Sequence, residues 1–252
     1  MTRNLATVIM AAGRGTRMKN PNKPKVMFEI LGKPMIEHVT TLASSLDASR
    51  TIAVVGFKRK SVVEHLKRVS PEIEFAVQEP QMGTGHAVMQ TEQLLGNFAG
   101  DVLVLSGDVP LLRISTIEGL RDLHRQKNAV ATILTAEVDD PGSYGRVIRD
   151  EEDHVAEIVE QKDATREQQT IKEINSGIYL FDKEQLFNAL HNVTTHNAQH
   201  EYYLTDVFDY FSKHRMRVAA KKAEDFNEVR GINTLEQLQA VENILLKRNG
   251  LS

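Results

Sequence analysis

The chain has 252 residues, of which 41% are hydrophobic and 26% are charged, as in a globular protein with a full hydrophobic core. Its formal net charge of −3 excludes the broadly basic surface that nucleic acids or anionic membranes attract. It contains no cysteine, which excludes disulfides, thiolate zinc sites and cysteine nucleophiles.

An apolar stretch near the N-terminus, at residues 5–12, ends in a glycine turn. It is too short for the core of a signal peptide with its cleavage site, and no later segment resembles a membrane span. We therefore expect a cytoplasmic protein that binds neither membranes nor nucleic acid.

Strand and helix patterns alternate through the first half of the chain. Apolar residues at helical spacing predict one helix that begins after Pro34 and a second over residues 62–69. Apolar, mostly β-branched runs predict strands before, between and after these helices, at residues 7–10, 51–55 and 102–105, and alternating apolar residues predict another at 73–77. This order predicts an α/β fold, a mostly parallel sheet with helices on both faces.

The pattern changes from about residue 138. Short strand-like segments lie at residues 145–148, 155–159 and 174–180, and we expect them to form a small antiparallel lobe at the edge of the sheet, over about residues 138–230. Leu235, Leu238, Val241 and Leu245 then predict a final amphipathic helix over 234–247.

A glycine turn directly follows the first strand. Gly13 and Gly15 let the backbone approach a phosphate closely with its N–H groups, and Arg14 and Arg17 add cationic donors. Lys25, after Pro24, adds a point charge. A tight turn without a ligand and a surface lysine are the structural alternatives for these residues taken singly.

Two other phosphate-binding motifs do not fit this turn. A dinucleotide fold requires a third small residue where Met18 stands and an acidic residue where Gly56 ends the second strand. A Walker loop requires Gly-Lys-Ser/Thr, whereas the chain has Gly15-Thr16-Arg17.

Together, the run Ala-Ala-Gly-Arg-Gly-Thr-Arg-Met at residues 11–18 and the pair Pro24-Lys25 resemble the signature of the sugar-1-phosphate nucleotidyltransferases. The resemblance is greatest to the uridylyltransferase domain of the bacterial bifunctional N-acetylglucosamine-1-phosphate uridylyltransferases/glucosamine-1-phosphate acetyltransferases. Further matching blocks follow in the family's order at residues 78–87, 107–111, 144–146, 158–164, 175–177, 201–206 and 231–233.

The resemblance implies a single nucleotidyltransferase domain over 1–252, Rossmann-like, with a nucleotide-binding part over about 1–137 and a sugar-binding antiparallel lobe over about 138–230. Arg17 and Lys25 would lie on the phosphates, and Gln78 would read uracil through a bidentate amide pairing. The residues implied to contact the nucleotide are Ala12, Gly13, Gly15, Gln78, Gly83 and Thr84.

The resemblance further implies Mg²⁺ as cofactor, with Asp108 and Asn233 as its protein ligands, because magnesium is usually held by few protein oxygens plus substrate phosphates. For Asp108 the alternative is a cap of the turn before Pro110, and for Asn233 it is an N-cap of the last helix. Gly145, Glu160 and Asn175 would bind the hydroxyls and the acetamido group of the sugar.

The implied reaction transfers UMP from UTP to a sugar 1-phosphate, with N-acetylglucosamine 1-phosphate as the expected acceptor and Arg17, Lys25 and Asp108 as the catalytic set. A pyrophosphorylase for another sugar 1-phosphate, such as glucose 1-phosphate, and a silent nucleotide-sugar sensor are the alternatives. The expected partners are UTP and the sugar 1-phosphate, bound by a monomer or a small homo-oligomer.

The chain departs from the bifunctional family in two ways. Ser106 stands where its members carry an aromatic residue before Gly-Asp, which we expect to change the packing beside the nucleotide. Hexapeptide periodicity is missing, so we expect no left-handed β-helix domain and no acetyltransferase activity. A metal site at His191, His196 and His200 is disfavoured, because the run 196–200 lacks the glutamate of a zinc-protease motif.

Overall fold

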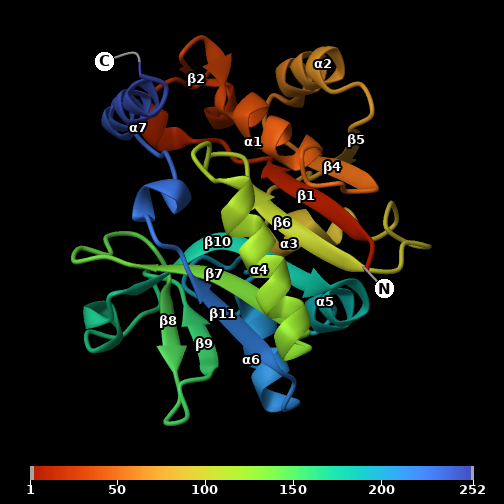
Figure 1. Cartoon of the computed structure of the whole chain (residues 1–252), viewed down its shortest axis with the longest axis vertical. Coiled ribbons are helices and arrows are strands. Elements are labelled where there is room, and N and C mark those ends of the chain that lie inside the picture. Colours follow the sequence, from red (N-terminus) through yellow and green to blue (C-terminus); the bar gives the residue numbers. More distant parts are fainter. Residues whose placement is uncertain (1–2, 251–252) are drawn as a thin grey trace.

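Aliphatic and β-branched runs form four adjacent parallel strands in the computed structural model, which describes residues 3–250 (Figure 1). They pair in the order β6-β1-β4-β5, which confirms the parallel arrangement predicted for the first half. The four strands are β1 (Leu5–Ala11), β4 (Arg50–Val55), β5 (Glu74–Val77) and β6 (Asp101–Ser106).

The full sheet has nine strands, and seven of them follow the order β11-β7-β10-β6-β1-β4-β5. Its other strands are β7 (Ala131–Glu137), β8 (Arg146–Arg149), β9 (Val155–Val159), β10 (Glu173–Asp182) and β11 (Val218–Lys222). A separate antiparallel pair joins β2 (Glu29–Ile30) to β3 (Lys33–Pro34).

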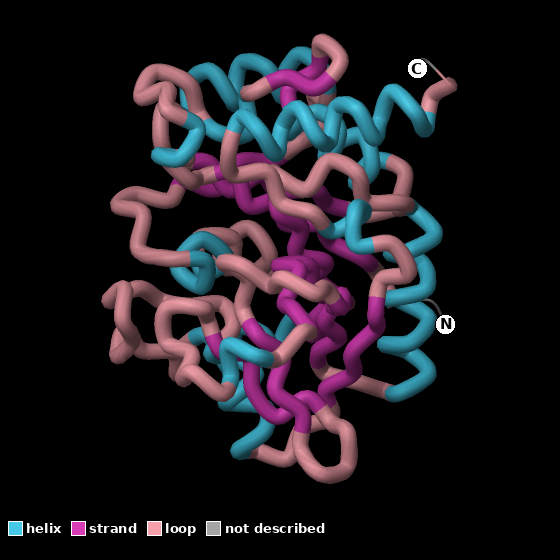
Figure 2. The backbone as a smooth tube through the Cα atoms, turned by 90° about the vertical axis from the view of Figure 1, so that its left-hand side faces the viewer, coloured by secondary structure: helices cyan, strands magenta, loops and turns pink. Residues whose placement is uncertain are grey.

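Helices cover both faces of the sheet, as predicted (Figure 2). One apolar cluster packs α3 (Thr84–Met89), α5 (Lys183–Leu190) and α6 (Asp206–Lys213) against one face. A second cluster packs α1 (Met35–Ser44), α2 (Arg59–Val69) and α4 (Ile114–Lys127) against the other. Within residues 3–250, no helix is long and apolar enough to cross a membrane.

The last helix, α7 (Leu235–Arg248), packs on the rest of the protein through a third, smaller apolar cluster, which contains Val241 of this helix and Ile30 of β2. Four short 3-10 helices complete the described elements, η1 (Thr16–Met18), η2 (Lys25–Met27), η3 (Gln168–Thr170) and η4 (Phe226–Val229).

The position of β10 corrects the prediction that residues 174–180 belong to a lobe at the sheet edge. β10 lies inside the sheet and pairs antiparallel with both β6 and β7. The reason is that it is apolar on both faces: Tyr179 and Phe181 belong to one cluster, and Ile178 and Leu180 to the other. A strand with two buried faces needs helices on both sides. Only the antiparallel pair β8–β9 stands off the main path.

Candidate active site

A cavity of about 740 Å³ lies at the carboxyl ends of β1, β5 and β6, the edge where doubly wound sheets bind ligands. Most residues predicted to contact the nucleotide line it. The lining side chains and backbone include Ala12, Gly13, Gly15, Lys25, Gln78, Gly83, Thr84, Ser106 and Asp108. Strand order has therefore brought segments from four separate parts of the chain to one opening.

The two glycines of the turn serve different needs. At Gly15, which has φ +63°, a Cβ would fall inside contact distance of the Cβ of Lys25, so the turn packs directly on the lysine. At Gly13, which lines the cavity, a Cβ would meet no protein atom within 4 Å. The protein's own packing requires the glycine at position 15 and does not require the one at position 13.

Lys25 lies at the centre of a polar cluster beside this turn. Its ammonium group pairs with the carboxylate of Asp108 and donates to Oδ1 of Asn233 at 2.9 Å. Arg17 donates to the same oxygen from Nη2 at 2.8 Å. Arg17 and Lys25 therefore meet at Asn233, and Asp108, the third residue implied to be catalytic, joins this cluster through Lys25.

Backbone contacts fix the C-terminal segment beside the cavity. The N–H of Ile232 donates to the carbonyl of Asp108 at 3.0 Å, and the N–H of Gly231 donates to the hydroxyl of Tyr144 at 3.0 Å. These two bonds hold Asn233 next to Asp108, 125 residues earlier in the sequence. The role of Tyr144 was not predicted, although the residue opens a matching block.

The structure excludes one of the two alternatives for Asn233, the N-cap of the last helix. The N-cap of α7 is Thr234, which forms a capping box with Gln237. Only the backbone N–H of Asn233 takes part, donating to Gln237 Oε1 at 2.7 Å. Its side chain is therefore not a helix cap and points its oxygen at the two cations.

The oxygens of Asp108 and Asn233 both face one cation, the ammonium group of Lys25. Carboxylate and amide oxygens are donors that suit magnesium. In the described part of the chain no three His, Asp or Glu side chains gather as a metal-binding group, so a metal at this point would take its further ligands from water or substrate oxygens. His191 instead lies 3.0 Å from Glu92.

Gln78 differs from its expected pairing geometry. It is buried, and its amide nitrogen donates to the carbonyl of Gly83 at 2.8 Å and lies 3.3 Å from Nδ1 of His86. Burial lowers the pKa of His86. The amino group of Gln78 is thus already engaged, which leaves its carbonyl oxygen as the group with acceptor capacity toward a ligand.

Gly83 is a position where only glycine fits. Its φ is +105°, and a Cβ there would lie 2.5 Å from the carbonyl oxygen of Tyr202. The N–H of Tyr202 also donates to Met82. This close packing places Glu201 in the lining of the cavity, a residue that sequence reasoning missed although it opens a matching block.

The three residues implied to bind the sugar lie together but outside the lining of this cavity. The N–H of Asn175 donates to the carbonyl of Gly145 at 2.9 Å, and a Cβ at Gly145 would lie 3.3 Å from the carbonyl of Val159, next to Glu160. Glu160 accepts from Thr205 Oγ1 at 3.2 Å. Burial, followed by the charges of nearby carboxylates, raises its pKa.

Two hydrogen bonds connect residues that line the cavity to the segment that carries Asn175 and to the segment that contacts Glu160. Ser106 Oγ donates to the carbonyl of Gly177 at 3.2 Å, two residues from Asn175. The N–H of Leu204 donates to Thr84 Oγ1 at 3.0 Å, beside the Thr205 that donates to Glu160. The small side chain of Ser106 therefore ties β6 to β10 at the end of the cavity.

Comparison with known proteins shows the family of the chain. Residues 6–229 match the family described as Nucleotidyl transferase. The chain is 45% identical over 241 residues to the "Bifunctional protein GlmU" of Streptococcus uberis, covering 96% of this chain and 52% of that protein. It is also 45% identical over 245 residues to the protein of the same name from Limosilactobacillus fermentum, covering 97% and 53%. The chain thus spans about half the length of these relatives.

Solved structures show the same fold at low sequence identity. A UDP-glucose pyrophosphorylase complexed with UDP-glucose superposes with a TM-score of 0.78 at 19% identity, covering 98% of this chain and all of that one. A putative glucose-1-phosphate thymidylyltransferase from Bacillus anthracis gives a TM-score of 0.73 at 19% identity, covering 95% and 94%. The nucleotide-diphospho-sugar transferase fold implied by the motifs is confirmed.

Proposed function

Because the chain belongs to the nucleotidyl transferase family, with relatives 45% identical over nearly its whole length, we propose that it transfers UMP from UTP to a sugar 1-phosphate. The proposed acceptor is N-acetylglucosamine 1-phosphate, and the products are UDP-N-acetylglucosamine and pyrophosphate. The observation that carries the proposal is the cluster of Lys25, Asp108, Asn233 and Arg17 at a cavity that begins with the glycine turn.

The cavity offers separate surfaces for the parts of a nucleoside triphosphate. Gln78, Gly83 and Thr84 form the end that suits a base and ribose, and Gln78 Oε1 can accept from the imide N–H of uracil. Gly13 and Gly15 present backbone N–H groups to phosphates, and the open space at Gly13 permits close approach.

The proposed chemistry is an in-line attack of the sugar-phosphate oxygen on the α-phosphorus of UTP. The P–O bond to pyrophosphate breaks as the new P–O bond forms. A phosphate monoester is already anionic, so the step requires no protein nucleophile or general base. Lys25 and Arg17 would stabilise the charge that develops on the transferred and leaving groups, and Asn233 holds both cations beside the cavity before substrates bind.

Asp108 and Asn233 would hold Mg²⁺, which supplies charge neutralisation and alignment of the phosphates when it is bound. The two oxygens already face a single cation in Lys25. We therefore propose that the ammonium of Lys25 leaves this position and turns to the phosphates when substrates bind.

The sugar side suits an acetamido group. Gly145 lies between the two residues: its carbonyl accepts from the N–H of Asn175, and a Cβ there would lie 3.3 Å from the carbonyl of Val159, the residue before Glu160. An amide donor and a carboxylate acceptor complement the carbonyl and N–H that N-acetylglucosamine has and glucose lacks. When glucose binds, these groups are left without hydrogen-bond partners. The site therefore discriminates against glucose 1-phosphate.

The test measures pyrophosphate release from the purified chain with Mg²⁺ over a grid of nucleotides and sugar 1-phosphates. We expect UTP with N-acetylglucosamine 1-phosphate to give the highest kcat/KM, at least about tenfold above UTP with glucose 1-phosphate, which corresponds to about 1.4 kcal/mol. Equal efficiency with both sugars would remove the sugar assignment and keep the uridylyl transfer.

A pyrophosphorylase for glucose 1-phosphate is the second candidate, favoured by the overall fold shared with UDP-glucose pyrophosphorylase. A silent sensor is the third, and no release with any pair of substrates would support it. The intact set of Arg17, Lys25 and Asp108 argues for catalysis, since a sensor does not need all three.

A further inference from the structure

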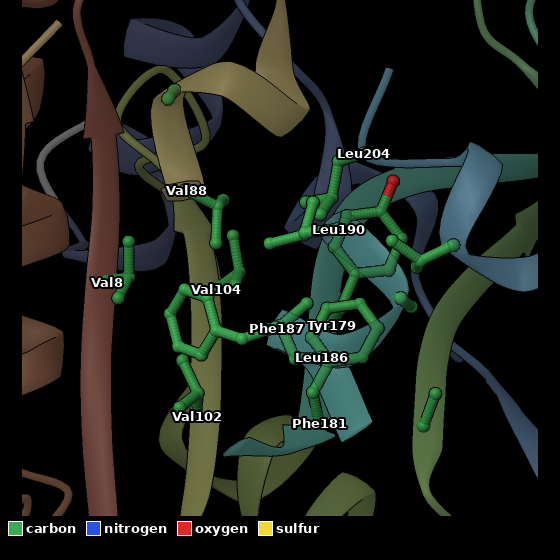
Figure 3. Close-up of a cluster of buried hydrophobic side chains, with 14 of the residues drawn as sticks. Val8, Val88, Val102, Val104, Tyr179, Phe181, Leu186, Phe187, Leu190 and Leu204 are labelled. Atoms are coloured by element: carbon green, nitrogen blue, oxygen red, sulfur yellow. The ribbon is translucent and has the colours of Figure 1, made fainter. Parts of the chain in front are cut away.

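Tyr179 places a hydroxyl group in an aromatic part of the core. The residue is 2% exposed, and its ring centroid lies 5.5 Å from that of Phe181 and 5.6 Å from that of Phe208. Figure 3 shows the ring among aliphatic and aromatic side chains, with the hydroxyl oxygen at its outer end. Phenylalanine would fill the same space, so the hydroxyl must be explained by what it bonds.

That hydroxyl donates to Oδ1 of Asn175 at 2.8 Å. The same oxygen accepts from the N–H of Gly177 at 2.9 Å. The backbone N–H can only donate, so it fixes which end of the amide is the oxygen, and the two bonds together use both lone pairs of Oδ1. Burial raises the pKa of Tyr179 far above its usual value, so the hydroxyl keeps its proton and remains available as a donor.

The other end of the amide is left for a ligand. Among the described residues, Nδ2 of Asn175 donates to no group, and it is not one of the enclosed polar atoms that lack a partner. Nδ2 therefore reaches solvent. It lies on the side of Gly145, since a Cβ placed on that glycine would be 3.6 Å from Nδ2. Asn175 therefore offers Nδ2 as a hydrogen-bond donor to a ligand, while two hydrogen bonds to its Oδ1 hold the amide in place.

We propose that Tyr179 is a positioning residue for sugar selection: its hydroxyl holds the amide of Asn175 so that Nδ2 donates to a carbonyl on the sugar's 2-substituent. This inference rests on the proposed function and deepens it. It assigns the choice of an N-acylated sugar to a buried residue that does not touch the sugar. Without the hydroxyl, the amide is held by one bond and can turn.

The experiment compares the chain with its Tyr179→Phe variant, which removes one oxygen and keeps the ring packing. We expect kcat/KM for N-acetylglucosamine 1-phosphate to fall about tenfold, mainly through KM, as for one weakened hydrogen bond. The KM of UTP and kcat/KM for glucose 1-phosphate should change less than about threefold. The preference between the two sugars therefore narrows.

Two further variants separate positioning from general damage. Tyr210→Phe removes a hydroxyl from a partly buried tyrosine that packs on the same apolar cluster, and it should leave the preference unchanged. Asn175→Asp keeps an oxygen for Gly177 and Tyr179 and replaces the outward donor by an acceptor, so it should abolish the preference. Thermal unfolding of each variant shows whether a change follows from lost stability.

Calorimetric binding of UDP-N-acetylglucosamine and UDP-glucose provides a readout that requires no turnover. We expect tighter binding of the N-acetyl compound and a smaller difference in Tyr179→Phe. An unchanged ratio in that variant, or equal loss for both sugars, overturns the inference while the uridylyl transfer stands. Absence of turnover with every sugar phosphate refutes the proposed function, and lack of a binding preference then overturns this inference as well.

Discussion

Lys25 and Asp108 form an ion pair at the carboxyl edge of the sheet, although 83 residues separate them in the sequence. Both side chains are less than one-fifth exposed, 17% and 18%. Asn233 accepts a hydrogen bond from the same ammonium group. A carboxylate and an amide oxygen therefore both contact the Lys25 ammonium group beside the glycine turn. These contacts hold the ammonium group at the lining of the cavity, and we propose that it turns from there to the phosphates when substrates bind.

Lys25→Ala and Asp108→Ala should each lower kcat about a hundredfold, because one lost contact of this type costs about 3 kcal/mol in the transition state. The measurement is pyrophosphate release at saturating substrates. Lys23→Ala is the matched control, since Lys23 lies two residues away and its ammonium group contacts Glu29 at 3.7 Å and the ring of Phe28 rather than Asp108 or Asn233. A loss smaller than about threefold in either variant removes that residue from the catalytic set.

The two glycines of the turn should respond differently to alanine. Gly13→Ala meets no protein atom, so the melting temperature should stay within about 1 °C, whereas UTP binding should weaken at least about tenfold because the methyl group enters the space of the phosphates. Gly15→Ala forces a Cβ onto Lys25 at a positive φ and should lower both stability and activity. Calorimetric UTP binding and thermal unfolding check both. Normal UTP binding by Gly13→Ala would contradict a phosphate site at this turn.

Activity should vanish with a chelator and return on addition of Mg²⁺. Asn233→Ala should raise the Mg²⁺ concentration for half-maximal activity at least about fivefold, since it removes one of two protein oxygens. Thr234→Ala is the control for a helix-capping effect. It removes the N-cap of α7, and it should cost about 1 kcal/mol of stability without changing the Mg²⁺ requirement. The same Mg²⁺ requirement in both variants would argue against Asn233 as a ligand.

Asp206 should make the folded chain sensitive to pH. Burial, followed by the charges of Glu160 and Asp163, raises its pKa to about 6. The folded state then holds a proton that the unfolded state releases near pH 4. The contribution of Asp206 to the free energy of unfolding therefore falls as pH rises from about 4 to about 6, and this loss of stability persists at neutral pH. It amounts to at most about 3 kcal/mol.

Asp206→Asn removes this cost, so its melting temperature should exceed that of the parent by a few degrees at pH 7.5 and by much less at pH 4. Asp209→Asn, on the same helix but exposed and paired with Lys213, should not show this pattern. Thermal unfolding across this pH range is the measurement. A stabilisation of Asp206→Asn that is equal at both pH values would refute the raised pKa.

The sequence by itself predicted most elements of the first half, the last helix and the edge of the sheet at which the cavity lies. Apolar residues at helical spacing predicted α1, α2 and α7, because this spacing reports which face of a helix is buried, and apolar, mostly β-branched runs predicted β1, β4 and β6. The glycine turn, Gln78 and Asp108 could be placed at one edge because parallel strands present their carboxyl ends together. The identities of the nucleotide-side residues came from motifs, and the cavity gathers nearly all of them.

Only the tertiary structure decided the contacts between distant segments. From the sequence, β10 was predicted to be a short strand of the lobe. In the structure it lies between β6 and β7, because helices cover both of its faces. That Asn233 faces Lys25 and is not the cap of α7 depends on Ile232 bonding to Asp108. That Tyr179 holds Asn175 depends on a bulge in β10, which turns residues four apart toward each other. Such contacts follow from strand order and packing, which local side-chain spacing does not encode.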